Sequence, residues 1–474
     1  MTTSHRPLIE AISTTLSPVD LFEYFRIDSF SFFLDSGMDP EKLGRYSFMG
    51  SQPFLTLSSR KNRITVTEND AKTVVYGNPF DILGRYLMEY RLDNTEDAVP
   101  FTGGAVGYLS YDLGHHIEKL PHKAVDDIKL PEMLFGFYDL VLAYDHKLNT
   151  TYLISSGFPE KNETGRLARA KSRLNEIKNK LEQTLPIREP IKNMTRKNYV
   201  IQGNFTRNNY INVVKKARLY IIDGDIFEVN LSQRFTTNIT IPTYELYRCL
   251  RRINPAPFAA YLGFDSVKIV SASPERFLKV SGNKVETRPI KGTIKRGKSP
   301  AEDLKQAQKL LNSAKDRAEN MMIVDLERND LGRVCVYGSI RVTELAVLET
   351  FPTVFHLTST VTGQLREDKD NIDLLKATFP GGSITGAPKI RAMEIIDELE
   401  PTRRSVYTGS LGYMGFDGNI DLNIVIRTFI VKGKKVYFQV GGAVVYDSEP
   451  RGEYEETLLK AKALVNALAT GSPR

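Results

Sequence analysis

Two pairs of acidic residues stand at helical spacing in this sequence. Asp316 and Glu319 occur in SAKDRAENMMIVDL, and Glu453 and Glu456 occur in RGEYEETLLKAKAL. Because side chains three positions apart share one face of a helix, two helices could each present two carboxylates. Such a set suits Mg²⁺, which prefers one or two direct carboxylates plus waters. On spacing alone, these acids are predicted to be solvated charges on a helix surface. Lys460 is expected either to pair with Glu456 within the helix or to bind a substrate carboxylate.

A glycine-rich turn in FPGGSITGAPKIRAMEII leads into a helix-patterned segment that begins near Pro388. Exposed backbone N–H groups at such a turn can bind an anion. The turn does not match a Walker loop, because Gly386 is followed by Ala, Pro and Lys. Ser383 and Thr385 could bind ligand oxygens or cap the helix, and the pattern alone favours capping.

Two strand-like segments near the end of the chain carry further candidates. Gly441 and Gly442 in FQVGGAVVYDS allow the backbone to approach a ligand closely, although a structural bulge explains them equally. Arg427 is the one charge in the apolar run NIVIRTFIV. It is therefore expected to be buried with an anionic partner, either a protein carboxylate or a substrate.

Lys291 in ETRPIKGTIKRGK follows Glu275 of SASPERFLK by sixteen positions. A lysine acts as a nucleophile when burial or nearby positive charge lowers its pKa. On this pattern alone, Lys291 is predicted to be a charged residue on the surface. His356, among the alternating apolar residues of FHLTSTVTG, reads as a structural histidine.

The elements that must position these residues differ between the two ends of the chain. Short alternating runs up to about residue 157 predict an antiparallel sheet, and residues 160–183 predict an amphipathic helix. The proline-containing LPIREPIKN predicts a linker. We therefore expect an α+β protein with two large sheets, divided into residues 1–185, a linker at 186–196, and a domain at 197–470.

Composition narrows the class of protein. The 474 residues are 41% hydrophobic and 26% charged, as in ordinary globular chains. The excess of 64 basic over 57 acidic residues is too mild to favour nucleic-acid binding. Two cysteines without metal-type spacing indicate no disulfide framework or zinc site. We expect no membrane span and, without a signal-like start, a cytoplasmic protein.

Several long motifs together closely resemble the chorismate-utilising family. They occur in this order: GGAVGYLSYDLG, GDIFEVNLSQRF, SASPERFL, TRPIKGT, AENMMIVDLERNDLGRV, GGSITGAPKIRAME and the acidic C-terminal helix. That family includes the large subunits of anthranilate synthase and aminodeoxychorismate synthase, with isochorismate and salicylate synthases. The resemblance implies a two-sheet α/β sandwich in which the N- and C-terminal regions interleave.

The resemblance also implies a metal site. Glu319 and Glu456 would bind Mg²⁺, and Asp316 and Glu453 would reach it through water. The ion would hold the ring carboxylate of chorismate.

The resemblance assigns the substrate pocket as well. Glu275 would be the general acid for the C4 hydroxyl, and His356 would pack near that hydroxyl. Arg427 and Tyr407 would bind the enolpyruvyl carboxylate. The rest of the implied pocket consists of Gly292, Thr293, Ser383, Thr385, Gly441, Gly442, Ala443 and Lys460.

One residue favours a branch of the family. Anthranilate synthases carry PIAGT where this chain has PIKGT, so Lys291 resembles the aminodeoxychorismate synthase branch. That branch implies addition of Lys291 at C2 of chorismate, followed by ammonia at C4. The alternatives are an anthranilate synthase large subunit and, remotely, a non-catalytic regulatory or nucleic-acid-binding protein with the same fold.

The resemblance also points to a partner protein and to a ligand other than chorismate. Family members receive ammonia from a glutamine amidotransferase, and we expect it as a separate glutaminase subunit because this sequence shows no such region. FFLDSG and NPAPFAAY resemble segments that bind tryptophan in relatives, which predicts Ser36, Pro257 and Phe258 as pocket residues. Whether tryptophan binds here stays open.

Two positions depart from the family pattern. Relatives usually carry a third glycine where this chain has Ala443, so a backbone N–H contact there requires a φ that suits alanine. Glu228 in FEVNL replaces a more common glutamine, and the sequence gives no consequence for that change.

Overall fold

The computed structural model describes residues 6–36, 38–93, 99–183 and 199–470. The linker predicted at 186–196 lies outside these residues. The amphipathic helix predicted before it is α3 (Glu163–Glu182). Asn162 caps that helix by accepting a hydrogen bond from the Gly165 N–H.

Within the described residues the strands form two antiparallel sheets, and each sheet has 12 strands. The first sheet, in spatial order, contains β1 (Leu8–Ile12), β10 (Thr150–Ser155), β9 (Leu140–Asp145), β3 (Tyr46–Gly50), β2 (Ser31–Asp35), β13 (Phe258–Gly263), β14 (Lys268–Ser273), β23 (Thr428–Lys432), β24 (Lys435–Val444), β12 (Glu228–Asn238) and β11 (Gln202–Gly203), with β20 (Gly386–Ala387) beside β12.

The second sheet contains, in order, β17 (Ile290–Lys295), β19 (Val354–Gln364), β16 (Lys284–Arg288), β15 (Arg276–Ser281), β22 (Ile420–Ile424), β21 (Ser410–Gly415), β7 (Gly104–Leu109), β8 (Met133–Tyr138), β4 (Leu55–Arg60), β5 (Arg63–Glu68) and β6 (Ala71–Tyr76), with β18 (Arg341–Thr350) beside β19.

Each sheet joins strands from both ends of the chain. In the first sheet β2 pairs with β13, so that Leu34 lies opposite Ala260. In the second sheet β7 pairs with β21, and Val106 lies opposite Tyr413. The predicted interleaving of the N- and C-terminal regions is therefore confirmed.

The two sheets pack face to face, with helices outside. Because side chains alternate along a strand, Phe32 of β2 packs between the sheets and the next residue, Phe33, packs under helices. The described helices are α1 (Pro18–Phe22), α2 (Pro79–Glu89), α3, α4 (Arg207–Ile222), α5 (Thr243–Ile253), α6 (Pro300–Leu311), α7 (Ala314–Gly332), α8 (Asn371–Thr378), α9 (Lys389–Leu399) and α10 (Pro450–Thr470), with short 3₁₀ turns η1 (Tyr111–His116) and η2 (Gly382–Ile384).

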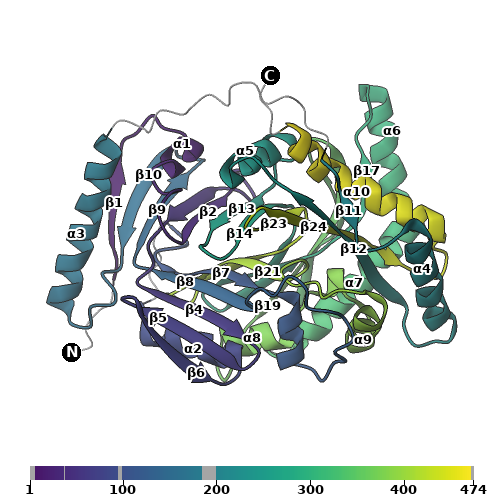
Figure 1. Cartoon of the computed structure of the whole chain (residues 1–474), viewed down its shortest axis with the longest axis horizontal. Helices are drawn as coiled ribbons and strands as arrows, with labels where there is room; N and C mark the ends of the chain where they lie inside the picture. The colour runs from purple at the N-terminus through teal and green to yellow at the C-terminus, as the bar shows by residue number, and fades with distance from the viewer. Residues whose placement is uncertain (1–5, 37, 94–98, 184–198, 471–474) are drawn as a thin grey trace.

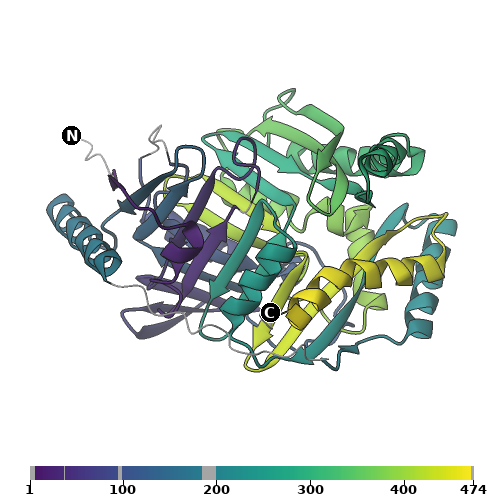
Figure 2. The same cartoon turned by 90° about the horizontal axis from the view of Figure 1, so that it is seen from above.

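The helices cover opposite outer faces of the sandwich. Helices α1, α3, α5 and α10 cover the first sheet, and α2 and α8 cover the second, whereas α9 packs against β12 and β20 of the first sheet (Figure 1). The C-terminal helix α10 lies beside the teal helix α5 (Figure 2). The predicted two-sheet α+β sandwich is confirmed. Of the helices in the described ranges, none combines the length and apolar character needed to cross a membrane.

Candidate active site

Lys291 lies at an irregularity in β17 that turns it away from regular pairing. The register of β17 against β19 shifts between Ile290 and Thr293, and Gly292 has a φ of +88°. A bulge of this kind re-aims a side chain. Gly292 is required twice over, because a Cβ there would also lie 3.1 Å from the Cβ of Asp316.

The Lys291 ammonium forms an ion pair with Glu228. Its Nζ donates a hydrogen bond of 2.6 Å to Glu228 Oε1. Lys291 is 7% exposed and Glu228 is fully buried. Glu228 belongs to β12 in the first sheet and Lys291 to β17 in the second, so the pair links the two layers of the sandwich.

The environment of Lys291 favours its charged form. Burial alone would lower the pKa of this lysine, but the Glu228 carboxylate outweighs burial and raises the pKa above its ordinary value. Glu319 and Glu275 add to the rise. The direction is opposite to that expected of a free nucleophilic amine, so Lys291 must transfer a proton before it can attack.

Glu275 is a buried acid close to this pair. Its Oε1 accepts hydrogen bonds from the Ser383 hydroxyl at 2.5 Å and from the Ile290 N–H at 3.3 Å. Burial raises the pKa of Glu275 to about 7, and the two hydrogen bonds and Lys291 oppose that rise. A carboxyl of this kind can hold a proton near neutral pH and donate it.

The glycine-rich turn positions Ser383 on Glu275 and does not cap a helix. It forms η2, and α9 begins after Pro388, where no side chain caps the helix. The helix-capping role favoured by the sequence pattern is therefore wrong for both hydroxyls. Thr385 Oγ1 donates to the carbonyl of Gly381 at 3.0 Å, so this hydroxyl stabilises the turn itself.

His356 lies on β19 beside the end of the lysine motif. Its Nδ1 shares a 2.7 Å hydrogen bond with the hydroxyl of Thr293. Burial lowers the pKa of His356 to about 3, and the charge of Arg427 contributes. The imidazole is therefore neutral at physiological pH.

The four acids of the predicted metal site come from α7 and α10. Lys315 lies 3.7 Å from Glu319 Oε1, and its charge also acts on Glu453 and Glu456. Across the described part of the chain, no three His, Cys, Asp or Glu side chains gather closely enough to hold a metal ion. The Oε1 atom of Glu319 is nevertheless buried and accepts no hydrogen bond, and a cation would satisfy it.

Lys460 holds one of these acids. Its Nζ pairs with Glu456 Oε1 at 2.6 Å and donates to the carbonyl of Gly441 at 3.0 Å. Burial opposes ionisation of Glu456, but Lys460 holds the pKa of this carboxyl below its ordinary value. The intrahelical partner expected from the sequence is therefore present.

The adjacent glycines lie in a regular part of β24. Gly441, Gly442 and Ala443 pair with β12 without a register shift, so the alternative of a structural bulge does not hold. None of the three has a positive φ, and alanine at 443 fits the backbone without strain. A Cβ on Gly442 would lie 3.3 Å from Glu453 and 3.5 Å from Glu456, which places this strand against α10.

Arg427 reaches this region with a left-handed backbone, at a φ of 52°. Burial lowers the pKa of its guanidinium, whereas Tyr407 and Glu456 oppose the change. Among the described residues no carboxylate lies within ion-pair distance of it, so the structure gives it no protein anion. Tyr407 is buried, and burial raises its pKa to about 12.

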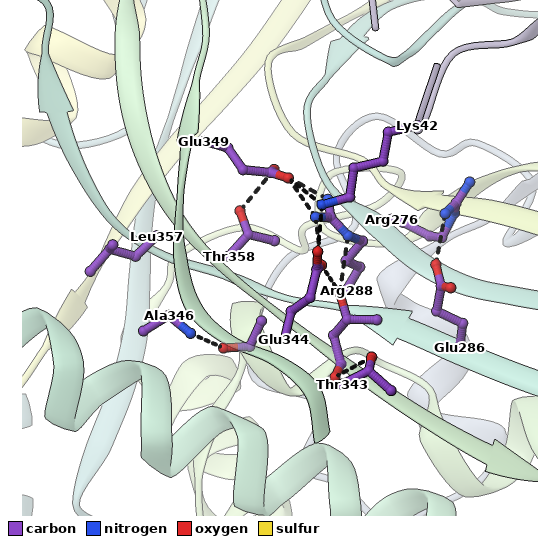
Figure 3. Close-up of polar contacts among 12 residues, drawn as sticks. Lys42, Arg276, Glu286, Arg288, Thr343, Glu344, Ala346, Glu349, Leu357 and Thr358 are labelled. Atoms are coloured by element: carbon purple, nitrogen blue, oxygen red, sulfur yellow. Dashed lines mark hydrogen bonds and ion pairs between the residues drawn. The ribbon is translucent and has the colours of Figure 1, made fainter. Parts of the chain in front are cut away.

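Arg288 fixes the strand that precedes Lys291. It is buried and pairs with Glu344 and Glu349 of β18, and Lys42 contacts the same two carboxylates (Figure 3). The Arg288 Nε also donates to the Thr360 hydroxyl at 3.2 Å. Four charges from three separate segments thus hold the end of β16 in place.

The predicted tryptophan-pocket residues border a different cavity. Ser36, Pro257 and Phe258 all line a space of about 620 Å³ that is bordered by inner strands of both sheets, such as β2 and β13 of the first and β21 and β22 of the second. Lys42 and Arg276 line it as well, but Lys291 and Glu228 do not. Because Arg276 follows Glu275 directly, adjacent residues serve the cavity and the candidate active site.

The structure thus brings Lys291, Glu275, Ser383 and the Thr293–His356 pair into one region, flanked by Glu319. It places Ser36, Pro257 and Phe258 elsewhere. Sequence reasoning assigned no role to Glu228, the direct partner of Lys291. The available signal was Glu228 itself, the one acidic residue in the strand-like FEVNLSQRF, because a buried carboxylate needs a cation.

Comparisons with known proteins agree with this arrangement. A family model described as chorismate binding enzyme matches residues 41–466. The chain is 40% identical over 465 residues to anthranilate synthase component 1 of Acetivibrio thermocellus, covering 97% of this chain and 94% of that protein. It is 40% identical over 472 residues to aminodeoxychorismate synthase component 1 of Escherichia coli K12, covering 96% and 99%.

A solved structure gives the same fold. The crystal structure of anthranilate synthase component I from Streptococcus pneumoniae TIGR4 matches with a TM-score of 0.77 and 32% identity, over 90% of this chain and 94% of that one. The two relatives, which are named for different activities, are equally identical to this chain, so sequence identity does not distinguish between the two activities.

Proposed function

Because this chain belongs to the chorismate-binding enzyme family, we propose that it aminates chorismate to 4-amino-4-deoxychorismate, as aminodeoxychorismate synthase component 1. The observation that carries the proposal is the position of Lys291, which is buried against Glu228 and near the acid Glu275. A surface lysine would need neither burial nor a dedicated carboxylate partner. The product would serve p-aminobenzoate and folate biosynthesis.

The first step forms a covalent adduct. Lys291 passes a proton to Glu228, and its neutral amine adds at C2 of chorismate. The ring double bonds shift, and the C4 hydroxyl leaves as water with the proton held by Glu275. Covalent catalysis of this kind divides one difficult displacement into two easier steps.

The second step releases the product. Ammonia adds at C4, the double bonds shift back, and the bond between C2 and the Lys291 nitrogen breaks with its electron pair returning to the amine. The new C4 ammonium gives one proton to the Glu275 carboxylate, which restores the acid, and Glu228 returns its proton to the Lys291 amine. The net change is chorismate plus ammonia to 4-amino-4-deoxychorismate plus water, with the enolpyruvyl group retained.

We propose that a magnesium ion binds at the acids of α7 and α10, because Glu319 has a buried oxygen that accepts no hydrogen bond. Glu319 and Glu456 would hold the ion, with Asp316 and Glu453 behind them. When bound, the ion would neutralise the ring carboxylate of the substrate. Lys315 faces the same acids and would have to move away from them.

Arg427 supports binding of the enolpyruvyl carboxylate. Its guanidinium has no carboxylate partner among the described residues, and a substrate anion would supply one. Tyr407 lies close enough to act on its charge. The backbone of Gly441 to Ala443 would close the pocket beside Lys460.

Ammonia requires a source. The relatives named above are called component 1, which implies a second component. We propose that the partner of this chain is a glutamine amidotransferase, because unprotonated ammonia is scarce at neutral pH.

The rival function is anthranilate synthesis. Relatives of that name are as identical to this chain as the aminodeoxychorismate synthases are. That reaction ends with loss of pyruvate and an aromatic product. It gives no role to a lysine at position 291, so the lysine favours the first proposal.

Product analysis tests the proposal. The purified chain is incubated with chorismate, Mg²⁺ and ammonium, with and without an aminodeoxychorismate lyase. We expect a non-fluorescent product that yields p-aminobenzoate only when the lyase is present. Fluorescent anthranilate formed without lyase would contradict the assignment.

A matched variant tests the covalent step. In Glu228→Gln/Lys291→Met neither side chain carries a charge, so no buried charge is left unpaired. This double variant should bind chorismate but lose amination at C4. Glu228→Gln alone removes the proton acceptor but keeps the lysine, whose pKa then falls, so this single variant should still form product. Undiminished product from the double variant would refute a covalent role for Lys291.

A further inference from the structure

Glu327 is a buried carboxylate of α7 that the proposed chemistry does not use. It is 2% exposed. The Gly382 N–H donates to its Oε1 at 3.1 Å, and the Thr287 hydroxyl donates to its Oε2 at 3.3 Å. One side chain therefore links the glycine-rich turn to the end of β16.

The two partners of Glu327 stand next to the two donors of Glu275. Gly382 directly precedes Ser383, and Thr287 lies three residues before Ile290. Both Ser383 and Ile290 donate to the same oxygen of Glu275, Oε1. An oxygen that accepts two hydrogen bonds does not carry the acid proton, so the proton resides on Oε2.

We propose that Glu327 is a positioning residue for Glu275. By holding the turn and the strand at a fixed separation, it keeps both donors on Oε1 and leaves Oε2 as the oxygen that protonates the substrate. The proposal rests on Glu275 acting as the acid of the proposed function. It adds a residue that touches neither substrate nor metal.

The local packing supports a specific contact. A Cβ at Gly382 would lie 2.9 Å from Glu327 Oε1 and 2.8 Å from the Leu326 side chain. Glycine at this position therefore permits the turn to approach α7 closely enough for the hydrogen bond. The approach would be unnecessary if Glu327 served only to fill space.

Charged groups surround the carboxyls of Glu327 and Glu275, and their charges also affect any pH dependence. Glu327 faces Asp330 on its own helix, Lys389 from α9, and Glu275. Lys389 is paired with Asp330. Glu275 in turn faces Lys291 from β17. A test therefore needs one variant that removes a hydrogen bond without changing any charge, and Thr287→Val provides it.

Three variants test the proposal: Glu327→Leu, Glu327→Gln and Thr287→Val. The rate of chorismate consumption is measured at saturating ammonium across the pH range, and kcat is separated from KM. Glu327→Leu should lower kcat by about 10- to 100-fold, the scale of a misplaced catalytic group, with little change in the KM for chorismate. Its alkaline limb should lie at higher pH than that of Glu327→Gln, which removes the same charge, because losing hydrogen bonds that favour the carboxylate raises the pKa of Glu275.

The other two variants separate positioning from folding. Glu327→Gln should restore kcat, because its amide oxygen can accept from Gly382 and its amide nitrogen can donate to Thr287. Thr287→Val should move the alkaline limb in the same direction by a smaller amount. If Glu327→Leu does not fold, Thr287→Val decides alone.

An alkaline limb that stays in place in Thr287→Val and in any folded Glu327→Leu would overturn the proposal. Chorismate consumption is followed independently of the product. Formation of anthranilate would therefore contradict the proposed function without affecting this test, since either amination requires an acid to protonate the departing C4 hydroxyl.

Discussion

Glu228 and Lys291 form a buried ion pair across the two sheets, with 2.6 Å between Oε1 and Nζ. Glu228 Oε2 is also buried and accepts no hydrogen bond. The lysine is thus the partner that compensates this carboxylate. Each residue therefore affects the ionisation of the other. Substituting either one tests both the stability of the fold and the chemistry of the site.

Removing the lysine alone should destabilise the fold. Lys291→Ala leaves Glu228 buried and unpaired, and breaking a buried pair typically costs about 3–5 kcal/mol. Urea unfolding should show a loss of that size, and the double variant Glu228→Gln/Lys291→Met should recover most of it. Equal stability of Lys291→Ala and the wild type would contradict the compensation.

Removing the carboxylate should make the lysine easier to deprotonate. In Glu228→Gln the main interaction that raises the pKa of Lys291 is gone, while burial, which lowers it, remains. Carbamylation of Lys291 by cyanate, followed by peptide mass spectrometry, should then begin at lower pH than in the wild type. Glu319 stays in place in both proteins and serves as the constant background. An unchanged midpoint would show that Glu228 does not control the amine.

Magnesium should stabilise the protein through the acids of α7 and α10. Ligand binding to the folded state raises the midpoint of thermal unfolding. The wild type should show this shift with MgCl₂ at constant ionic strength, and Glu319→Gln should reduce it. Asp325→Asn, an exposed position on the same helix, removes equal charge outside the proposed site. Equal shifts in all three proteins would exclude Glu319 as a ligand.

His356 should remain neutral well below neutral pH. Its pKa in the folded protein is about 3, against 6.5 ordinarily. Because the folded pKa is the lower one, the imidazole contributes stability that is fully present above pH 6.5 and is lost as pH falls toward 3.

Two measurements check this behaviour. The ring carbon–proton signals of His356 should not shift between pH 8 and pH 5. Relative to His356→Gln, which keeps a partner for Thr293, the wild type should lose about 1.6 kcal/mol of stability between pH 6.5 and 5, because the slope approaches 1.36 kcal/mol per pH unit only once the unfolded imidazole is fully protonated. A midpoint near 6.5 would contradict the prediction.

The sequence predicts local features well, because these depend on short-range patterns. The amphipathic helix at 160–183 begins within three residues of its expected start, where Asn162 can cap it. The pairs Asp316 and Glu319, and Glu453 and Glu456, do lie on helices. Lys460 pairs with Glu456 one turn away, as helical spacing requires.

Long-range contacts escaped prediction. Glu228 and Lys291 are 63 residues apart and belong to different sheets, and no local pattern connects them. Lys291 was predicted to lie on the surface, but a bulge at Gly292 directs its side chain into the buried site. Likewise, Ser383 looks like a helix cap until the fold places Glu275 beside it.

The shared construction of the two sheets has a consequence for how the chain folds. β24 lies between β23 and β12, and β21 lies between β22 and β7, so strands made early must wait for partners made late. Contacts between distant segments slow folding, since loop-closure entropy opposes them. During synthesis the first half would expose unpaired strand edges until the last strands emerge, and such edges are templates for aggregation.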